Sequence, residues 1–392
     1  MTRRLVLSAV IVLAACCGAV WSAGEPARTV VIRAGKIWTM AGRVVSDGVV
    51  VVRDGKIRAV RDNSSAPGEA DVLDMSDKHV MPGLIDAHCH IGLSLNPLNE
   101  INETVHAVTP QMQIIDAFDP TSEDLRKAVR WGVTAVMLAP GDRNPVGGQT
   151  AVVKLHGRET SQWLVKEACG IKMSLTNEAL MHDRAPTSRA GLLRMLRDEF
   201  DRADQYDDEG MSDTSLDVLQ KAIHGELPVY MTARSADEVQ AGLRLIEQYD
   251  LKAVLVDVAE TEEAATRIAE RGIGIIHGPM LRLSRNRELK RFGVLAQKDV
   301  KLAFASHGPR SSLHDLRTSA VIATKHGLDP NEALKALTIN AAELLGVAKR
   351  LGSIERGKDA DLVIFSGHPL EQTSAVEMVM INGVVVYRRQ DI

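Results

Sequence analysis

The stretch Pro82-Gly83-Leu84-Ile85-Asp86-Ala87-His88-Cys89-His90 carries more information about the fold than any other part of this chain. Its apolar run is typical of a buried strand, along which successive side chains alternate between two faces. His88 and His90 therefore point to one face, and Cys89 points to the other. Two imidazoles that project side by side from a strand end form half of a site for a divalent ion such as zinc. For this pair alone, two unrelated histidines remain an equally good interpretation.

This strand and several motifs after it resemble those of one enzyme superfamily. The segments at 333–346 and 352–363 resemble the last helix and the closing strand of the amidohydrolase superfamily, and the motif at 82–90 resembles its first strand. From these motifs the chain is identified as a divergent member of that superfamily, over residues from about 29 to the C-terminus. Three shorter motifs resemble its imidazolonepropionase-like branch: Val146-Gly147-Gly148-Gln149 with Lys154, Ile171-Lys172-Met173, and Pro186-Thr187-Ser188-Arg189.

Composition limits the classes of partner. With 392 residues, the chain is long enough for one barrel domain with an appended domain. Apolar residues make up 45% of the chain and charged residues 25%, which is ordinary for a globular protein. The net charge of −4 and the lack of a basic block argue against nucleic acid or an anionic membrane surface as a partner. A small-molecule substrate or ligand is the expected partner.

The first residues have the pattern of an export signal. Arg3 and Arg4 precede an apolar run at 5–15 that is too short to span a bilayer. We therefore predict a signal peptide over residues 1–24. Leu13-Ala14-Ala15-Cys16 resembles a bacterial lipobox, in which Cys16 becomes a lipidated first residue, whereas simple cleavage near residue 24 is the alternative. Both predict a protein of the bacterial periplasm or one anchored in the cell envelope.

The rest of the chain divides into two patterns. Residues 28–81 and 352–392 contain short β-branched runs with hairpin signals. Because an isolated hairpin is only marginally stable, the two ends are expected to join in one composite β-sandwich domain, the arrangement that the resemblance also implies. Residues 82–351 alternate apolar strands with amphipathic helices, which is typical of a (β/α)₈ barrel of the TIM type. We predict barrel strands at 84–90, 135–139, 151–155, 171–175, 229–233, 253–257, 274–277 and 302–306.

The resemblance implies metal-dependent hydrolysis, but the expected ligands are changed. The superfamily places a carboxylate or a modified lysine on strand four, histidines on strands five and six, and an aspartate at the end of strand eight. The corresponding positions here are Asn177, Thr232, Asp257 and His307. Since a threonine hydroxyl cannot replace an imidazole as a zinc ligand, the usual binuclear centre is not expected.

Two interpretations of this site remain open. In one, the protein is an inactive member that binds a ligand or has a structural role in the cell envelope. In the other, the site is shifted: His277 ends strand seven and His307 ends strand eight, next to strand one in a closed barrel. His277 and His307 would then join His88 and His90 around a single divalent ion, with zinc as the expected metal and His307 as the catalytic residue.

Two further side chains are candidates for substrate binding. Arg189 follows a Pro-Thr-Ser turn and has the guanidinium geometry that clamps a carboxylate, although Thr187 or Ser188 also fits a helix cap. Lys154, at the end of the third predicted strand, is expected to line the pocket. For the active alternative, the resemblance implies hydrolysis of a C–N bond in a non-peptide or small-peptide amide, cyclic amides included.

Overall fold

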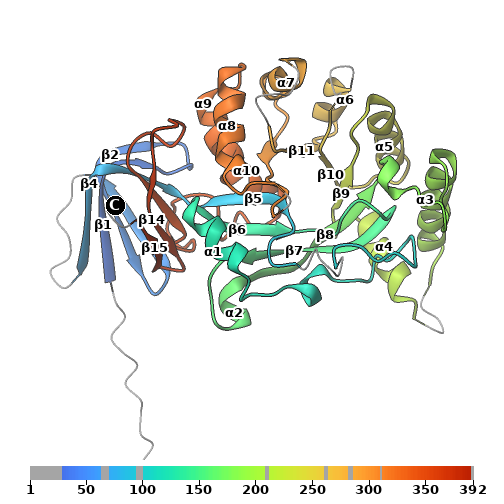
Figure 1. The fold of residues 1–392 in the computed structure, drawn as a ribbon, viewed down its shortest axis with the longest axis horizontal. Helices are drawn as coiled ribbons and strands as arrows, with labels where there is room; N and C mark the ends of the chain where they lie inside the picture. The colour runs from blue at the N-terminus through green and yellow to red at the C-terminus, as the bar shows by residue number, and fades with distance from the viewer. Residues whose placement is uncertain are drawn as a thin grey trace, which may run out of the picture.

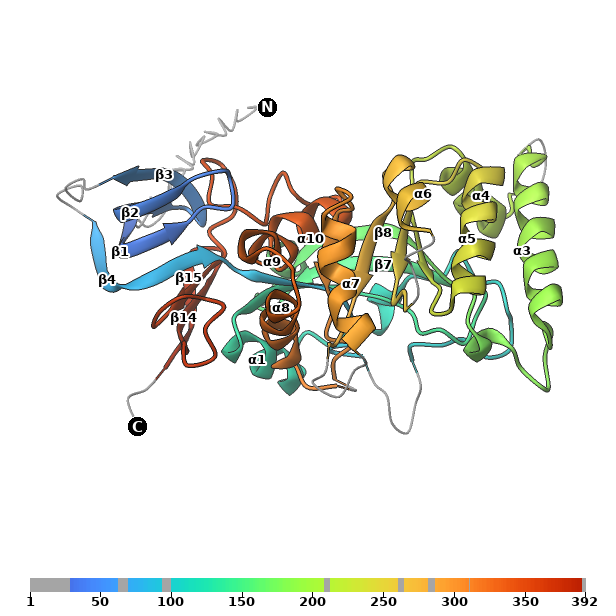
Figure 2. The ribbon, with the colours of Figure 1, turned by 90° about the horizontal axis from the view of Figure 1, so that it is seen from above.

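The structure, a computed structural model, describes residues 29–62, 70–93, 100–207, 212–259, 264–280, 286–309 and 311–389. The predicted leader at 1–24, with Cys16, lies outside the described residues. The described chain forms one sheet of seven strands and one of eight, which lie side by side along the long axis of the molecule (Figures 1 and 2). None of the helices in these ranges has the length and apolar character needed to cross a membrane.

The seven-stranded sheet is built from both ends of the chain. Strand β4 pairs in parallel with β1 and antiparallel with β13, so that it joins the N-terminal strands to the C-terminal ones. Asn382 and Gly383 both have positive φ between the last two strands, as a tight hairpin turn requires. The sheet has the order β15-β14-β13-β4-β1-β2-β3, with bounds β1 (Thr29–Trp38), β2 (Val44–Arg53), β3 (Lys56–Asp62), β4 (Asp71–Pro82), β13 (Leu362–Phe365), β14 (Val376–Ile381) and β15 (Val384–Arg388).

The eight-stranded sheet closes almost completely into a barrel. Beyond the last strand, the backbone N–H of His307 donates to the carbonyl of His88 at 3.2 Å, and that of His90 donates to the carbonyl of Gly308 at 2.7 Å. The predicted fold class, a TIM-type barrel with a separate β domain, is thus confirmed. The barrel strands are β5 (Leu84–Cys89), β6 (Val133–Leu138), β7 (Val146–Lys154), β8 (Leu164–Ser174), β9 (Val229–Thr232), β10 (Ala253–Val256), β11 (Gly274–His277) and β12 (Leu302–Phe304).

One strand departs from the predicted all-parallel pattern. Strand β7 runs antiparallel to both of its neighbours, β6 and β8. The connection at 139–145 is too short for the crossover that a parallel pair requires, so the chain turns back as a hairpin. The C-terminal end of β7 therefore lies at the opposite edge of the barrel from the C-terminal ends of the parallel strands. The prediction of a parallel third strand was wrong.

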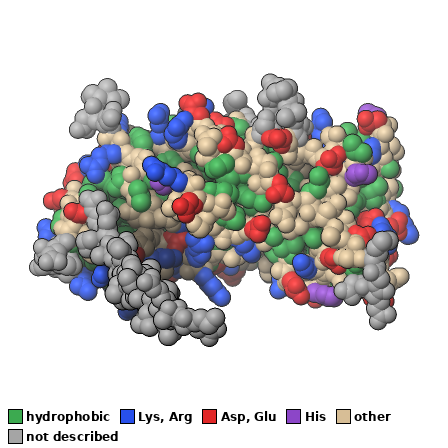
Figure 3. Space-filling model, turned by 90° about the horizontal axis from the view of Figure 1, so that it is seen from below, with side chains coloured by type: hydrophobic (Ala, Val, Ile, Leu, Met, Phe, Trp, Pro, Cys, Tyr) green, Lys and Arg blue, Asp and Glu red, His purple; other side chains and the backbone are tan. Residues whose placement is uncertain are grey.

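Helices surround the barrel strands on the outside (Figure 1). The Ser188 hydroxyl accepts the backbone N–H of Gly191 at 3.2 Å and caps α3, which confirms the cap interpretation of this turn. Charged side chains of both signs are spread over the face in Figure 3. The helices are α1 (Glu123–Arg130), α2 (Thr160–Trp163), α3 (Arg189–Asp204), α4 (Thr214–Ile223), α5 (Ala236–Gln248), α6 (Ala265–Glu270), α7 (Asn286–Ala296), α8 (Asp315–Lys325), α9 (Pro330–Ala336) and α10 (Ile339–Leu344), with short 3₁₀ turns η1 (Ile114–Ala117) and η2 (Asn177–Ala179).

Candidate metal centre

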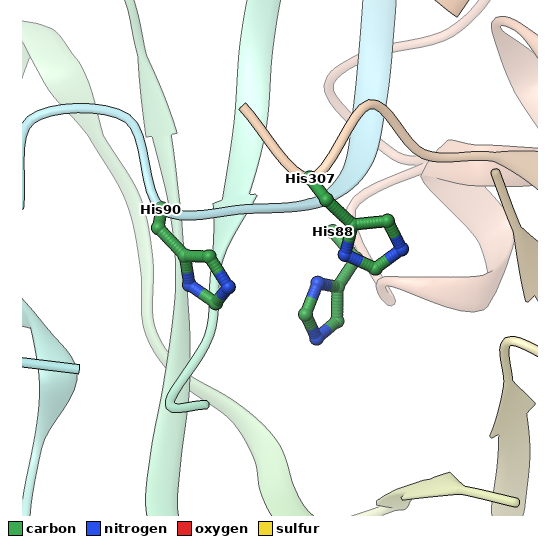
Figure 4. Close-up of side chains that lie close together, drawn as sticks. All are labelled: His88, His90 and His307. Carbon is green, nitrogen blue, oxygen red and sulfur yellow. The ribbon is translucent and has the colours of Figure 1, made fainter. Parts of the chain in front are cut away.

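Three histidines meet at the C-terminal edge of the barrel. His88 and His90 come from the end of β5, and His307 comes from the loop after β12 (Figure 4). One ring nitrogen from each lies within 4.8 Å of those of the other two. The His307 backbone has a φ of 54°, a left-handed conformation that non-glycine residues seldom adopt. The site therefore forms where the last strand closes against the first.

Of the three histidines, His88 has the fewest hydrogen-bond partners for its ring nitrogens. Its side chain is buried, and neither ring nitrogen has a hydrogen-bond partner among the described residues. Burial lowers the pKa of His88 well below its usual value, and the neighbouring charges of His307 and Lys172 lower it further. A neutral imidazole is the form that binds zinc and similar ions. Because a buried unsatisfied polar group is costly, a divalent cation bound to the nitrogen that carries the lone pair would relieve part of this cost.

His90 and His307 are each held by a second group. The Nδ1 of His90 lies 2.8 Å from the carbonyl oxygen of Ala139, so Nδ1 carries the proton and the Nε2 atom carries the lone pair. The Nε2 of His307 lies 2.9 Å from the Asp257 carboxylate. Burial alone would lower the pKa of His307, but Asp257 raises it above the usual value. Asp257 directly follows β10 and lies 50 positions before His307, so no local sequence pattern indicates this pairing.

Asp86 fixes the strand that carries the first two histidines. Its buried carboxylate accepts the backbone N–H groups of Ser306 at 3.0 Å and of His88 at 3.3 Å, and also the Ser306 hydroxyl. Burial raises the pKa of Asp86. Neither Asp86 nor Ser306 was predicted as a site residue. Their contacts join β5 to the loop after β12 and so set the spacing between His88 and His307.

A buried lysine lies on the other side of the site. The Lys172 ammonium on β8 donates to the Thr232 hydroxyl at 2.8 Å and forms an ion pair with Asp142. Burial would raise the pKa of Asp142, but Lys172 and Arg234 lower it to about 2. The strand-four ligand was sought at Asn177, which is exposed in η2. A lysine inside an apolar strand was the signal that would have indicated Lys172 instead.

The other predicted residues do not join the three histidines. His277 lies outside their group and lines a cavity of about 300 Å³ that also contacts Asp257 and Arg234. Of the four histidines expected to converge, the candidate group in the described chain therefore contains three, without His277. The guanidinium of Arg189 pairs with Asp237 and lies 3.6 Å from Glu238, so nearby carboxylates already occupy it.

Lys154 belongs to a different part of the molecule. Its ammonium is fully buried, 2.7 Å from Asp359 and 2.8 Å from Asp361, and it also donates to the Asn382 side chain. These partners belong to the C-terminal segment that builds the β domain. Because β7 is reversed, Lys154 is at the edge opposite the histidines. The predicted role of Lys154 in substrate binding is wrong, and its contacts hold the barrel to the β domain.

Comparisons with known proteins agree with the fold described above. The model of the amidohydrolase family matches residues 79–386. The chain is 24% identical over 375 residues to an imidazolonepropionase of Thermoplasma volcanium, covering 88% of this chain and 92% of that protein. It is 23% identical to the amidohydrolase tasK of Hapsidospora irregularis, covering 90% of this chain but only 40% of tasK. The crystal structure of an amidohydrolase from Thermotoga maritima superposes with a TM-score of 0.85 at 30% identity, covering 92% of this chain and all of that one.

Proposed function

This chain belongs to the amidohydrolase family, and from this premise we propose that it hydrolyses a C–N bond in a non-peptide or small-peptide amide. We propose further that His88, His90 and His307 hold one divalent ion, with zinc as the expected metal. The observation that carries this proposal is the pair of buried His88 nitrogens without hydrogen-bond partners in the described chain. Three imidazoles in this arrangement match the ligand number of catalytic zinc sites.

The residues around the histidines have separate tasks in this proposal. A bound divalent ion supplies an activated water and polarises the scissile carbonyl. Asp257 accepts the Nε2–H of His307 and turns the other ring nitrogen toward His88 (Figure 4). We assign the amide to the cavity lined by His277 and by Asp257, the hydrogen-bond partner of His307. Lys172 and Arg234 both pair with Asp142, and these contacts fix the loop after β6 and the end of β9 near the histidines.

A second candidate function has its own support. The positions where family members carry further ligands hold Asn177, Thr232 and Asp257, and Asn177 lies exposed in η2. A barrel without a second metal position fits an inactive protein that binds a small ligand. The metal content and the hydrolytic activity of the purified protein distinguish the two functions.

The test is elemental analysis combined with a hydrolysis assay. Protein purified without chelators is expected to contain about one equivalent of zinc or a similar ion per chain. It should hydrolyse at least one member of a panel of cyclic amides, N-acyl amino acids and dipeptides. Dialysis against a chelator should abolish the activity, and added metal should restore it. Protein that takes up no metal at micromolar supply would contradict the enzyme and leave the ligand-binding function.

We also propose that the protein is exported. The support is the sequence of residues 1–24, with Arg3 and Arg4 before an apolar run. Intact-mass analysis of membrane and periplasmic fractions should show a chain shortened at its N-terminus. A mass that includes acyl chains on Cys16 would establish a lipid anchor, and an unlipidated product cut near residue 24 would establish simple cleavage. A full-length product in the cytoplasm would contradict export.

A further inference from the structure

A second cavity lies on the flank of the molecule, and none of the three histidines lines it. Its volume is about 590 Å³. Its walls come from the C-terminal end of α1, the start of α8, the segment at 372–376 and strand β15. Helix α1 contacts both β14 and β15, so the cavity is at the junction of the barrel and the β domain. The proposed hydrolytic function makes no use of it. We call it the flank cavity.

The flank cavity is strongly cationic. Its lining contains four lysines or arginines and one histidine, but no aspartate or glutamate: Lys127, Arg130, Arg317, Arg389 and His314. The whole chain has the opposite balance, with 47 lysines and arginines against 51 acidic residues. A concave surface of one sign attracts ligands of the other sign. The cavity is therefore suited to an anion.

Two of these cations already have carboxylate partners outside the cavity. Lys127 lies 3.1 Å from Asp124, and Arg389 lies 3.5 Å from Glu377. Both pairs are at least partly exposed to solvent, which makes them weak. The positive charge that is available to a ligand therefore comes mainly from the other two, Arg130 and Arg317.

Arg317 and Arg130 have no carboxylate partner in the described part of the chain. The Arg317 Nη1 atom donates to the carbonyl of Ser374 at 2.7 Å, and the guanidinium carbon lies 5.3 Å from the centre of the Phe365 ring. Burial lowers the pKa of Arg317 from its usual value. A half-buried guanidinium with only neutral partners has lost hydration without gaining an opposite charge. An anion from outside the chain would supply that charge.

The wall beside these arginines is aromatic. Trp131 is 43% exposed, and its ring lies edge-on to His314 with 4.7 Å between ring centres. Tyr387 lines the same cavity. An exposed tryptophan in a concave site offers a flat apolar surface to a ligand, and its ring favours stacking with another ring. The lining therefore favours a ligand that carries both a negative charge and a flat ring.

We propose that the flank cavity binds a small organic anion that carries a ring. Its carboxylate or phosphate group is held by Arg130 and Arg317, and its ring lies against Trp131. Guanidinium groups bind both kinds of anion through paired hydrogen bonds, so the same two arginines can bind a carboxylate or a phosphate. This site is independent of the metal centre and of whether the protein hydrolyses amides.

Calorimetric titration of the purified protein at low salt tests this site with four probes: benzoate, phenyl phosphate, inorganic phosphate and benzyl alcohol. At least one of the two aromatic anions should bind, and more tightly than inorganic phosphate. The tighter of the two identifies the preferred anionic group. Benzyl alcohol, which lacks the charge, should bind at least about tenfold more weakly than that anion. An alcohol that binds as well as the anions would overturn the proposal.

Variants locate the binding. R130Q and R317Q should each weaken binding of the anion by about tenfold or more. W131A should weaken binding of the aromatic anions but not that of inorganic phosphate. R194Q, which removes an exposed arginine paired with Asp198 on α3, is the matched control and should bind normally. The Arg130 side chain makes no hydrogen bond within the described chain, so R130Q should fold even if R317Q does not. Anion binding that is absent in the wild type, or unchanged in R130Q, would overturn the proposal.

Discussion

Replacement of His88 by alanine is expected to remove the bound metal and, with it, the hydrolytic activity. His88 contributes a buried imidazole whose nitrogens have no partner in the described chain, so a metal ion is the partner that the geometry fits. Loss of one of three ligands should weaken metal binding by at least about 100-fold, since loss of a group that merely orients a ligand already weakens it 10- to 100-fold. Elemental analysis and kcat/KM measure the two effects.

The stability of the H88A variant gives an independent readout. In the absence of metal, its melting temperature should stay close to that of the wild type, because lost packing is offset by the removal of two unsatisfied nitrogens. With metal present, the wild type alone should gain stability. The exposed His156 provides the control, and H156A should keep both metal and activity. Full metal content in H88A would contradict the assignment of His88 as a ligand.

Replacement of Lys154 by alanine is expected to be the most destabilising single change. The Lys154 side chain is fully buried, and its ammonium lies within 3 Å of the carboxylates of Asp359 and Asp361. Its removal leaves Asp361 buried without that positive partner, and breaking a buried ion pair in this way costs about 3–5 kcal/mol. Urea unfolding of the purified K154A variant measures the change in the free energy of unfolding.

The exposed ion pair of Lys127 with Asp124 provides the matched control for K154A. Since Lys127 is about half exposed, K127A should lower the free energy of unfolding by less than about 1 kcal/mol. A double variant, K154M with D361N, should be more stable than K154A, because it removes the buried charge of Asp361 together with that of its lysine partner. If K154A unfolded at the same urea concentration as the wild type, Lys154 would not hold the barrel and the β domain together.

The sequence predicted those features that depend on neighbouring residues. Alternation along a strand placed His88 and His90 on one face, and the hairpin signals predicted in residues 352–392 include Asn382-Gly383, where the structure has a hairpin. The approach of His307 to His88 could also be predicted, because closure of a barrel makes the last strand a neighbour of the first.

Features that depend on strand direction or distant contacts were missed. Lys154 was placed at the wrong edge because the pattern of an apolar strand is the same in either direction, and only the short connection at 139–145 indicates the reversal. The contact between Asp257 and His307 joins residues 50 positions apart, and no local pattern encodes it. The motif Ile171-Lys172-Met173 gave Lys172 no role in the site, because its burial depends on Asp142, whose position depends on the same reversed hairpin.

The reversal of β7 also affects how this protein can diversify. In an all-parallel barrel, each loop on the substrate side leads into a helix, so a change in its length disturbs the helical layer. Here the loop at 139–145 joins two adjacent antiparallel strands and leads into no helix, yet it carries Asp142 to the side of Lys172. Most of this loop is buried, but Arg143 is exposed, and insertions at an exposed position are tolerated best. Changes at the exposed part of this loop can therefore alter the surroundings of the histidine site while the rest of the barrel keeps its packing.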